Sequence, residues 1–344
     1  GWPGSAGDPN FQGFDLFYGY NCQRMAHNYY PTHMWHNQEK ELLDNPAFKA
    51  RSKLPPEADP NDSASYAAYK GNDFAPDFML SAAERFIRTS ADGGAPFFLY
   101  YPSPIPHLAL QIPDKELEVY EGEWEETPYV GGKGYLPHQK PRAAYAAMIS
   151  RLDREVGVLM ETLDELGMTE NTLFIFTSDN GPSWVGGVDR VFFESSGGLR
   201  GRKAQLLEGG IRVPAIISYP AKVPKGEVRN QIATAMDWLP TVIDLCQIKP
   251  KDNSPKLDGH SLLPIIRSSK AQSEYKGILH FQWHTQWAVR QGEWKLIGRG
   301  AKASFLGNLN DPQPERKNYR AEKNDLVREM TELHHAWVEE VKPK

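Results

Sequence analysis

The side chains best suited to chemistry in this sequence lie in three short segments: an oxygen-rich pair, a histidine and a lysine. Asp179 and Asn180 stand side by side and are followed by Gly181 and Pro182. A carboxylate next to an amide oxygen suits a hard divalent cation such as Ca²⁺ or Mg²⁺, which takes oxygen ligands. Asp-Asn-Gly is also an ordinary turn sequence, so the pair taken alone is compatible with a structural turn as well.

His107 closes the segment Pro102-Ser-Pro-Ile-Pro-His107, in which three prolines fall within five residues. These prolines fix the backbone that carries the imidazole, because the proline ring locks φ. A histidine held this rigidly can act as a general acid or as an anion ligand. A lone histidine is more often a structural residue, and the residues alone leave that interpretation open.

A basic segment, Arg200-Gly-Arg-Lys203, is the third candidate. Nearby glycines would allow the backbone to approach an anion closely, because they have no side chain in the way. These glycines are Gly197, Gly198, Gly201, Gly209 and Gly210. The alternative interpretation is a solvated basic turn without a ligand.

The elements around these candidates indicate an α/β layer. Short apolar runs predict strands buried on both faces at 95–101, 172–178 and 213–218. Helices are predicted over 73–89 with Asp73 as the cap, over 142–166 with Gly167 at the end, and over 237–246. Such strands between amphipathic helices favour a mostly parallel sheet sandwiched by helices. Ligands bind outside the carboxyl ends of strands in such sheets, which is where His107 and Asp179 stand.

The pattern changes after about residue 270. The apolar runs at 278–283, 287–290 and 293–297, with a Gln291-Gly292 turn, predict a small antiparallel sheet. An amphipathic helix over 321–341 closes the chain. We therefore expect two parts, a large α/β region at 1–268 and a small sheet-and-helix region at 269–344.

Composition excludes several classes of protein. The 344 residues carry a formal net charge of −5, which gives no electrostatic reason to expect a nucleic-acid binder. The longest charge-poor stretch, 93–113, contains five prolines and cannot run as a membrane helix. The two cysteines, Cys22 and Cys246, cannot build a disulfide framework or a structural zinc site.

Several motifs together resemble the formylglycine-dependent sulfatases of the alkaline phosphatase superfamily, arylsulfatase-like enzymes. The most specific motif is Leu199-Arg-Gly-Arg-Lys-Ala-Gln-Leu-Leu-Glu-Gly-Gly-Ile-Arg-Val-Pro214. The other matching segments are Gly13-Phe-Asp-Leu-Phe-Tyr-Gly19, Pro106-His107, Thr177-Ser-Asp-Asn-Gly-Pro182, Met236-Asp-Trp-Leu-Pro-Thr241 and Asp258-Gly-His-Ser-Leu-Leu263. The resemblance spans almost the whole chain.

The resemblance implies a role for each candidate. Asp179 and Asn180 would be two ligands of Ca²⁺, with Mg²⁺ as the alternative. His107 would contact the sulfate and help to protonate the leaving oxygen. Lys203 would neutralise the sulfate charge and reach the same oxygen. The resemblance also implies hydrolysis of a small-molecule or carbohydrate sulfate ester and a periplasmic or secreted location.

One departure from the family pattern matters more than the agreement. The family's nucleophile is a formylglycine made from a Cys or Ser within Cys/Ser-x-Pro-x-Arg, and that motif is absent. Cys22 is followed by Gln-Arg-Met and is not that residue. The family's paired N-terminal aspartates and first catalytic lysine are absent as well. We therefore expect these groups in a preceding segment, and expect the 344 residues alone not to turn over sulfate esters.

Two other functions remain open from the sequence. A phosphate or phosphonate ester hydrolase of the same superfamily can share the metal and lysine positions, and a pseudo-sulfatase could keep only the anion pocket. Four tryptophans are candidates for sugar stacking: Trp124, Trp184, Trp283 and Trp287. The histidines His27, His33 and His36 stand among aromatic residues, where they line a substrate cleft or, on the simpler interpretation, form a packed aromatic loop.

Overall fold

The computed structural model describes residues 3–132, 134–251, 253–273, 275 and 277–342. These residues form two compact units, Gly1–Thr169 with Ser183–Phe193, and Glu170–Pro182 with Glu194–Lys344. The expected division into 1–268 and 269–344 stays a prediction. Within the described ranges, no helix is both long enough and apolar enough to cross a membrane.

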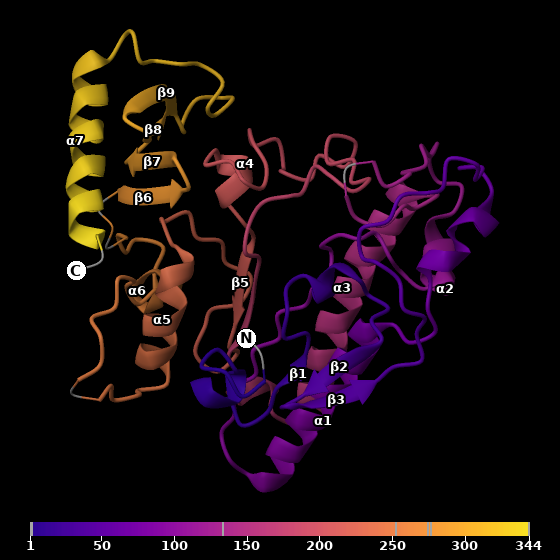
Figure 1. The fold of residues 1–344 in the computed structure, drawn as a ribbon. Coiled ribbons are helices and arrows are strands. Elements are labelled where there is room, and N and C mark those ends of the chain that lie inside the picture. The colour runs from indigo at the N-terminus through magenta and orange to yellow at the C-terminus, as the bar shows by residue number, and fades with distance from the viewer. Residues whose placement is uncertain (1–2, 133, 252, 274, 276, 343–344) are drawn as a thin grey trace. The chain divides into compact units, whose positions relative to one another are not determined.

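The first unit combines a small sheet with helices (Figure 1). The strands β1 (Tyr18–Gly19), β2 (His33–His36) and β3 (Glu39–Leu42) pair antiparallel in that order. The helices are α1 (Ala75–Gly93), α2 (Asp114–Leu117) and α3 (Pro141–Glu165). Helices α1 and α3 pack together. The main core of this unit gathers around Tyr29, Leu108, Leu110 and Met148.

The helices of the first unit confirm two predictions and correct one. α1 and α3 lie where the periodicity places them, and α3 ends before Gly167, which has φ +67°. Asp73 does not cap α1, because the N-cap residue is Phe74. The Asp73 carboxylate instead accepts a hydrogen bond of 2.7 Å from the backbone N–H of Asp44. The Asp73 carboxylate, which the sequence predicts as the cap of the helix, therefore binds the backbone of a loop instead.

The second unit begins with two paired strands. β4 (Phe174–Thr177) and β5 (Ala215–Ser218) are antiparallel neighbours, with Phe176 opposite Ile216. Between them lies the short helix α4 (Glu208–Ile211), and after them come α5 (Trp238–Leu245) and α6 (Leu263–Arg267). The predicted strands at 172–178 and 213–218 and the helix at 237–246 are thus present.

The predicted strand at 95–101 is not formed in the structure. A strand needs a neighbour for its backbone hydrogen bonds, and no described strand pairs with this segment. Its apolar side chains are correspondingly uncovered: Phe98 and Tyr100 are each 66% exposed. Ile216 on β5 is also 61% exposed, so a strand expected to be buried on both faces is open on one.

The C-terminal part is a four-stranded antiparallel sheet with one helix against it (Figure 1). Its strands are β6 (Ile278–Trp283), β7 (Gln286–Gln291), β8 (Trp294–Arg299) and β9 (Lys302–Asn308). Helix α7 (Asn324–Val341) packs on β7, β8 and β9. Met330 of α7 is fully buried with Trp287, Leu296 and Leu306.

The α/β class and the small C-terminal sheet with its helix are confirmed. The strand pairs that the structure describes are all antiparallel, β4 with β5 included. β9 is an additional strand that the sequence pattern did not indicate.

Candidate active site

Asp179 and Asn180 lie directly after β4, at the carboxyl end of that strand. Asp179 is exposed, and its carboxylate makes no hydrogen bond or ion pair with the residues that the structure describes. The Asn180 side-chain N–H donates to the carbonyl of Gly181 at 3.1 Å, which leaves Oδ1 as the outward acceptor of the amide. The pair therefore presents oxygen atoms that a hard cation can take.

The lysine segment is hydrogen-bonded directly to this loop. The backbone N–H of Lys203 donates to the carbonyl of Pro182 at 3.0 Å, and that of Gly181 donates to the carbonyl of Gly210, also at 3.0 Å. The side chain of Lys203 is half-buried and makes no ion pair within the described ranges. The backbone of Lys203 is thus held against the loop that follows Asp179 and Asn180.

Glycine is required where these two segments meet. A Cβ on Gly181 would lie 2.0 Å from the carbonyl oxygen of Gly209, and a Cβ on Gly210 would lie 2.1 Å from that of Gln205. In the structure, Gly209 and Gly210 allow the close approach of backbone to backbone. The close approach of an anion to the glycines of this segment stays a prediction.

His107 belongs to the first unit, on a loop that is fixed from beneath. The hydroxyl of Tyr29, a residue with no exposed surface, lies 2.7 Å from the carbonyl of Pro104 and 2.8 Å from that of His107. The His107 Nδ1 lies 2.8 Å from the carbonyl of Leu108. A carbonyl only accepts, so Nδ1 carries a proton and Nε2 is the nitrogen that gains or loses one.

The loop before His107 is tied to helix α3. The hydroxyls of Tyr101 and Ser103 each donate to Glu155 Oε2 at 3.2 Å. Glu155 is fully buried and pairs with Arg151 at 3.1 Å, one turn earlier on the same helix. Burial raises the pKa of Glu155, and the Arg151 guanidinium opposes that rise.

The three histidines near the N-terminus do not form one cluster. His27 stacks on His107, with ring centroids 5.2 Å apart and planes 7° apart, and both rings meet the edge of Tyr135. His33 and His36 lie on β2, against Trp35 and Tyr18 respectively. Only His27 is therefore part of the surroundings of His107.

The structure brings three of the four predicted residues into one unit. Asp179, Asn180 and Lys203 share the second unit, and His107 belongs to the first. No described group of three or more His, Cys, Asp or Glu side chains could hold a metal. Asp179 and Asn180 fit a cation by their chemistry, but they would supply only part of its ligands.

Other residues that support the site were missed by the sequence analysis. Tyr29 and Glu155 hold the His107 loop, and Lys295 and Glu315 contact the segment after Lys203. Lys295 carries a detectable signal, because it is a lysine within the apolar run Trp294-Lys-Leu-Ile297. Tyr29, Glu155 and Glu315 have no such signal in the sequence.

Two of the motifs behind the family resemblance prove to be structural. Asp237 is fully buried, accepts from the backbone N–H groups of Thr234 and His260, and also bonds to the hydroxyl of Tyr275. A Cβ on Gly259 would lie 2.0 Å from the carbonyl of Met236. The segments 236–241 and 258–263 therefore hold each other in place.

The tryptophans proposed for sugar stacking divide into buried and accessible ones. Trp287 is 3% exposed, donates to the carbonyl of Gly300 and stacks on His334, so it is a core residue. Trp124 stacks on Tyr120. Trp184 and Trp283 are 38% and 43% exposed and remain candidates.

The sequence matches the models of two known protein families. The model of the sulfatase family matches residues 14–248. The model of the C-terminal region of N-sulphoglucosamine sulphohydrolase matches residues 202–338. The chain therefore belongs to the sulfatase family, as the motifs indicated.

Individual relatives agree with this assignment. The chain is 30% identical over 289 residues to an N-acetylgalactosamine-6-O-sulfatase of Bacteroides thetaiotaomicron, which covers 78% of this chain and 51% of the relative. It is 33% identical over 165 residues to the steryl-sulfatase of Mus musculus, covering 45% of this chain and 26% of the relative. The chain thus spans about half the length of the first of these relatives and about a quarter of the length of the second.

Solved structures share the fold. A crystal structure of Ps i-CgsB in complex with k-i-k-neocarrahexaose matches with a TM-score of 0.71 at 23% identity, covering 96% of this chain and 67% of that one. A protein in complex with its substrate D-glucosamine-2-N,6-O-disulfate matches with a TM-score of 0.68 at 16% identity, covering 95% and 76%. At these identities the matches establish the fold.

Proposed function

We propose that this chain supplies part of the active site of an enzyme that hydrolyses sulfate esters. The observation that carries the proposal is the hydrogen bond between Lys203 and Pro182, which joins the lysine segment to the loop of Asp179 and Asn180. The carboxylate of Asp179 and the ammonium of Lys203 both lack partners within the described ranges. Such a site offers a cation and a positive clamp to an anionic group.

Each residue has a distinct role in the proposal. Lys203 neutralises charge on the sulfate group as it builds up on the leaving oxygen. His107 donates a proton to that oxygen from Nε2, since Nδ1 is held as a donor to the carbonyl of Leu108. Its loop is pre-organised by Tyr29 and Glu155, so little reorganisation is needed at the moment of reaction.

Asp179 and Asn180 are proposed to bind Ca²⁺, with Mg²⁺ as the alternative. A bound divalent cation would place positive charge against the sulfate oxygens. Two adjacent ligands are too few for Ca²⁺, which takes six to eight oxygens. We propose that further ligands come from residues outside this chain.

The formylglycine nucleophile of the family does not fit the residues present. No Cys/Ser-x-Pro-x-Arg motif exists, Cys22 is half-buried, and Cys246 is exposed. We propose that a preceding segment supplies this group. The exposed side chains of Phe98, Tyr100 and Ile216, which sit on apolar runs that would be covered in a complete α/β layer, support this proposal.

A carbohydrate sulfate is the proposed substrate class, and a periplasmic or secreted location accompanies it. The first relative acts, by its name, on N-acetylgalactosamine 6-O-sulfate, and two structural neighbours hold a carrageenan-type or glucosamine saccharide. The alternatives, a phosphate or phosphonate ester hydrolase and a pseudo-sulfatase, are not favoured by the family match.

The experiment compares the native gene product with the 344-residue chain. We expect the native product to be longer, to carry the mass change of formylglycine, and to hydrolyse 4-nitrophenyl sulfate and N-acetylgalactosamine 6-sulfate when Ca²⁺ is present. The 344-residue chain alone is expected to show no turnover above a protein-free control.

Three other outcomes would count against the proposal. Faster turnover of 4-nitrophenyl phosphate than of the sulfate would favour the phosphatase alternative. Binding of sulfated saccharide without turnover by the native product would favour the pseudo-sulfatase. Turnover by the 344-residue chain alone would show that the nucleophile lies within it.

A further inference from the structure

A group of three charged side chains, all buried in the second unit, joins the C-terminal sheet to the lysine segment. Lys295 on β8 and Glu315, between β9 and α7, have no exposed surface, and Glu208 at the start of α4 is 5% exposed. Lys295 Nζ lies 2.8 Å from Glu208 Oε1 and 3.2 Å from Glu315 Oε1. The backbone N–H of Glu208 donates to Glu315 Oε2 at 2.8 Å. These three residues are called the buried triad below.

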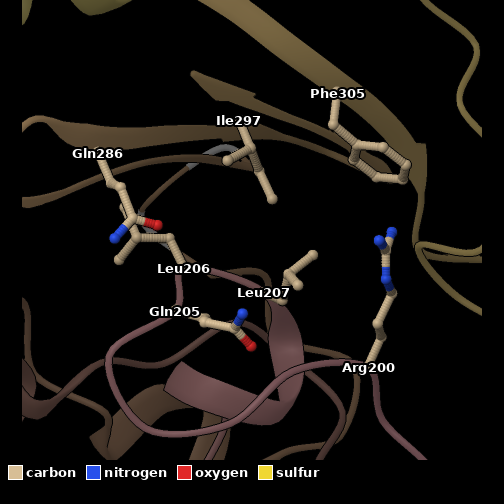
Figure 2. A pocket seen from close by; sticks show the side chains of 7 residues that line it. All are labelled: Arg200, Gln205, Leu206, Leu207, Gln286, Ile297 and Phe305. Atoms are coloured by element: carbon tan, nitrogen blue, oxygen red, sulfur yellow. The ribbon is translucent and has the colours of Figure 1, made fainter. Parts of the chain in front are cut away.

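Arg200 provides a second link between the lysine segment and the C-terminal sheet. A cavity of about 140 Å³ lies between the lysine segment and the sheet. Figure 2 shows Leu207 below this space, with Ile297 and Phe305 above it. The Arg200 guanidinium lies 5.0 Å from the centre of the Phe305 ring and donates to the carbonyl of Glu315 at 2.6 Å. Arg200 therefore adds a cation–π contact and a charge-assisted hydrogen bond to the anchoring by the triad.

The anchored segment leads directly to the candidate ligands. Glu208 begins α4, and Gly210 within α4 accepts the backbone hydrogen bond of Gly181, the residue after Asn180. The two backbones approach closely at this point, because a Cβ on Gly181 would lie 2.0 Å from the carbonyl oxygen of Gly209. A displacement of Glu208 would therefore move the loop that carries the oxygen ligands.

Stability alone explains the triad poorly. A buried ion group costs desolvation free energy, and apolar residues of similar volume often stabilise a protein as well or better. Two carboxylates also share one ammonium here, which burial makes more costly. A fixed geometry for the attached segment is the better explanation.

We propose that Glu208, Lys295 and Glu315 are positioning residues, through which the C-terminal sheet sets the place of Lys203 and of the Asp179–Asn180 loop. The roles of the positioned residues rest on the proposed function, whereas the coupling itself does not. The sheet thereby becomes part of the active-site machinery without contacting substrate.

The test measures amide hydrogen exchange in the 344-residue chain without Ca²⁺. Lys295→Met removes the ammonium while keeping most of the volume, and Lys302→Met, at an exposed position of β9, is the matched control. We expect exchange at the Gly181 and Lys203 amides to rise about tenfold or more in Lys295→Met, because two buried carboxylates lose their counter-charge. We expect wild-type rates at the same amides in Lys302→Met.

A milder variant keeps the test decisive if Lys295→Met fails to fold. Glu208→Gln keeps the size and an acceptor oxygen but removes one charge, and the same amides should exchange about threefold faster. Wild-type rates at Gly181 and Lys203 in every triad variant that folds would overturn the proposal. An equal rise in Lys302→Met would overturn it too.

Hydrogen exchange with added Ca²⁺ distinguishes the coupling between the triad and the Asp179–Asn180 loop from the proposed metal role of that loop. In the native gene product, which would carry the remaining ligands, protection of the 179–181 amides by Ca²⁺ tests the metal role of Asp179 and Asn180. Where that protection exists, the Ca²⁺ concentration for half-protection should rise in the triad variants and stay unchanged in Lys302→Met, which a purely structural role would not produce. Absence of protection in the native gene product would refute the metal role, and the exchange result without Ca²⁺ would still decide the coupling.

Discussion

The loop that carries His107 and the segment that carries Lys203 are anchored by different kinds of contact. Beneath His107, the Tyr29 hydroxyl binds two loop carbonyls, and Glu155 accepts from two loop hydroxyls. Beneath Lys203, the anchor is the buried triad, in which the partners of Glu208 come from the C-terminal sheet and the connection after it. Beneath His107 the carboxylate of Glu155 pairs with Arg151 on its own helix, whereas beneath Lys203 the ion group joins α4 to the C-terminal sheet.

This difference affects what each segment depends on. The His107 loop is held by residues of its own unit, including the helix α3 that carries Glu155. The Lys203 segment is held by residues about a hundred positions later in the chain, Lys295 and Glu315. We therefore expect C-terminal substitutions to act on Lys203 and the oxygen ligands, and to leave the His107 loop unaffected.

The largest expected effects come from removing the two side chains that we propose to act on the sulfate group. In the native gene product, Lys203→Ala should lower kcat for a sulfate ester about 10²–10³-fold across the whole pH range, since it removes charge stabilisation. His107→Ala should lower kcat about 10²-fold or more and flatten the basic limb of the pH profile, since it removes a proton donor.

The shape of the pH profile separates the two roles. Lys302→Ala, at an exposed lysine of β9, serves as the control and should behave as the wild type. A flattened profile in Lys203→Ala, with an unchanged one in His107→Ala, would reverse the roles assigned here.

Gly210→Ala tests the close packing of the Lys203 segment. Its Cβ would lie 2.1 Å from one backbone carbonyl and 2.5 Å from another, those of Gln205 and Arg202, so we expect a loss of about 3 kcal/mol in the free energy of unfolding. The control is Gly157→Ala in α3, where an added Cβ meets nothing within 4 Å. That variant should gain about 1 kcal/mol, because alanine favours the helix.

Urea unfolding of both variants measures these changes. The test depends on the opposite signs of the changes in the free energy of unfolding of Gly210→Ala and Gly157→Ala. If Gly210→Ala proved neutral, the turn over 202–210 would have room for a Cβ, and close packing within the Lys203 segment would be lost as an explanation of how that segment is held.

Tyr29→Phe tests the hydroxyl contacts beneath His107. The variant leaves two buried carbonyls without the hydroxyl, at a cost of about 1–2 kcal/mol in the free energy of unfolding. Exchange of the His107 amide, which donates to the carbonyl of Pro104 at 2.7 Å, should rise while that of Lys203 stays constant. A rise at Lys203 of similar size would show that the two anchors are not separate.

More of the candidate site could be predicted from the sequence than of the contacts that hold it in place. Asp179, Asn180 and Lys203 could be predicted because polar residues stood beside apolar runs and glycines, and the structure places them together in one unit. The helices α1 and α3 could be predicted because the helical spacing of apolar residues is visible within one segment of the chain.

The residues that could not be predicted act through distant partners. Glu315 acts through its contacts with Lys295 and Glu208, which are distant in the sequence. Tyr29 likewise acts through the carbonyls of the His107 loop. The strand at 95–101 failed for a related reason, because an apolar run predicts burial but does not supply a pairing neighbour. Asp73 shows the same limit at a helix end, where Asp44 competes for its carboxylate.

The smallest expected effect is a dependence of stability on pH at the ionic anchor. Burial raises the pKa of the Glu315 carboxyl above its ordinary value of 4.5, while Lys295 and the backbone N–H of Glu208 oppose that rise and the Glu208 carboxylate adds to it. Arg200 faces the same residue through its backbone carbonyl. The folded protein thus holds this proton more tightly than the unfolded chain does. The stability that results is complete below pH 4.5 and is lost as the pH rises through the raised pKa.

Glu315→Gln removes this dependence and keeps an oxygen for the backbone N–H of Glu208. The free energy of unfolding of the variant, relative to the wild type, should therefore rise between pH 4.5 and pH 7. Urea unfolding at several pH values measures it, with Glu161→Gln at an exposed position of α3 as the control. A relative stability that falls over this range would mean that the ionised form of Glu315 is the favoured one. Lys295 would then outweigh burial as the influence on the pKa of Glu315.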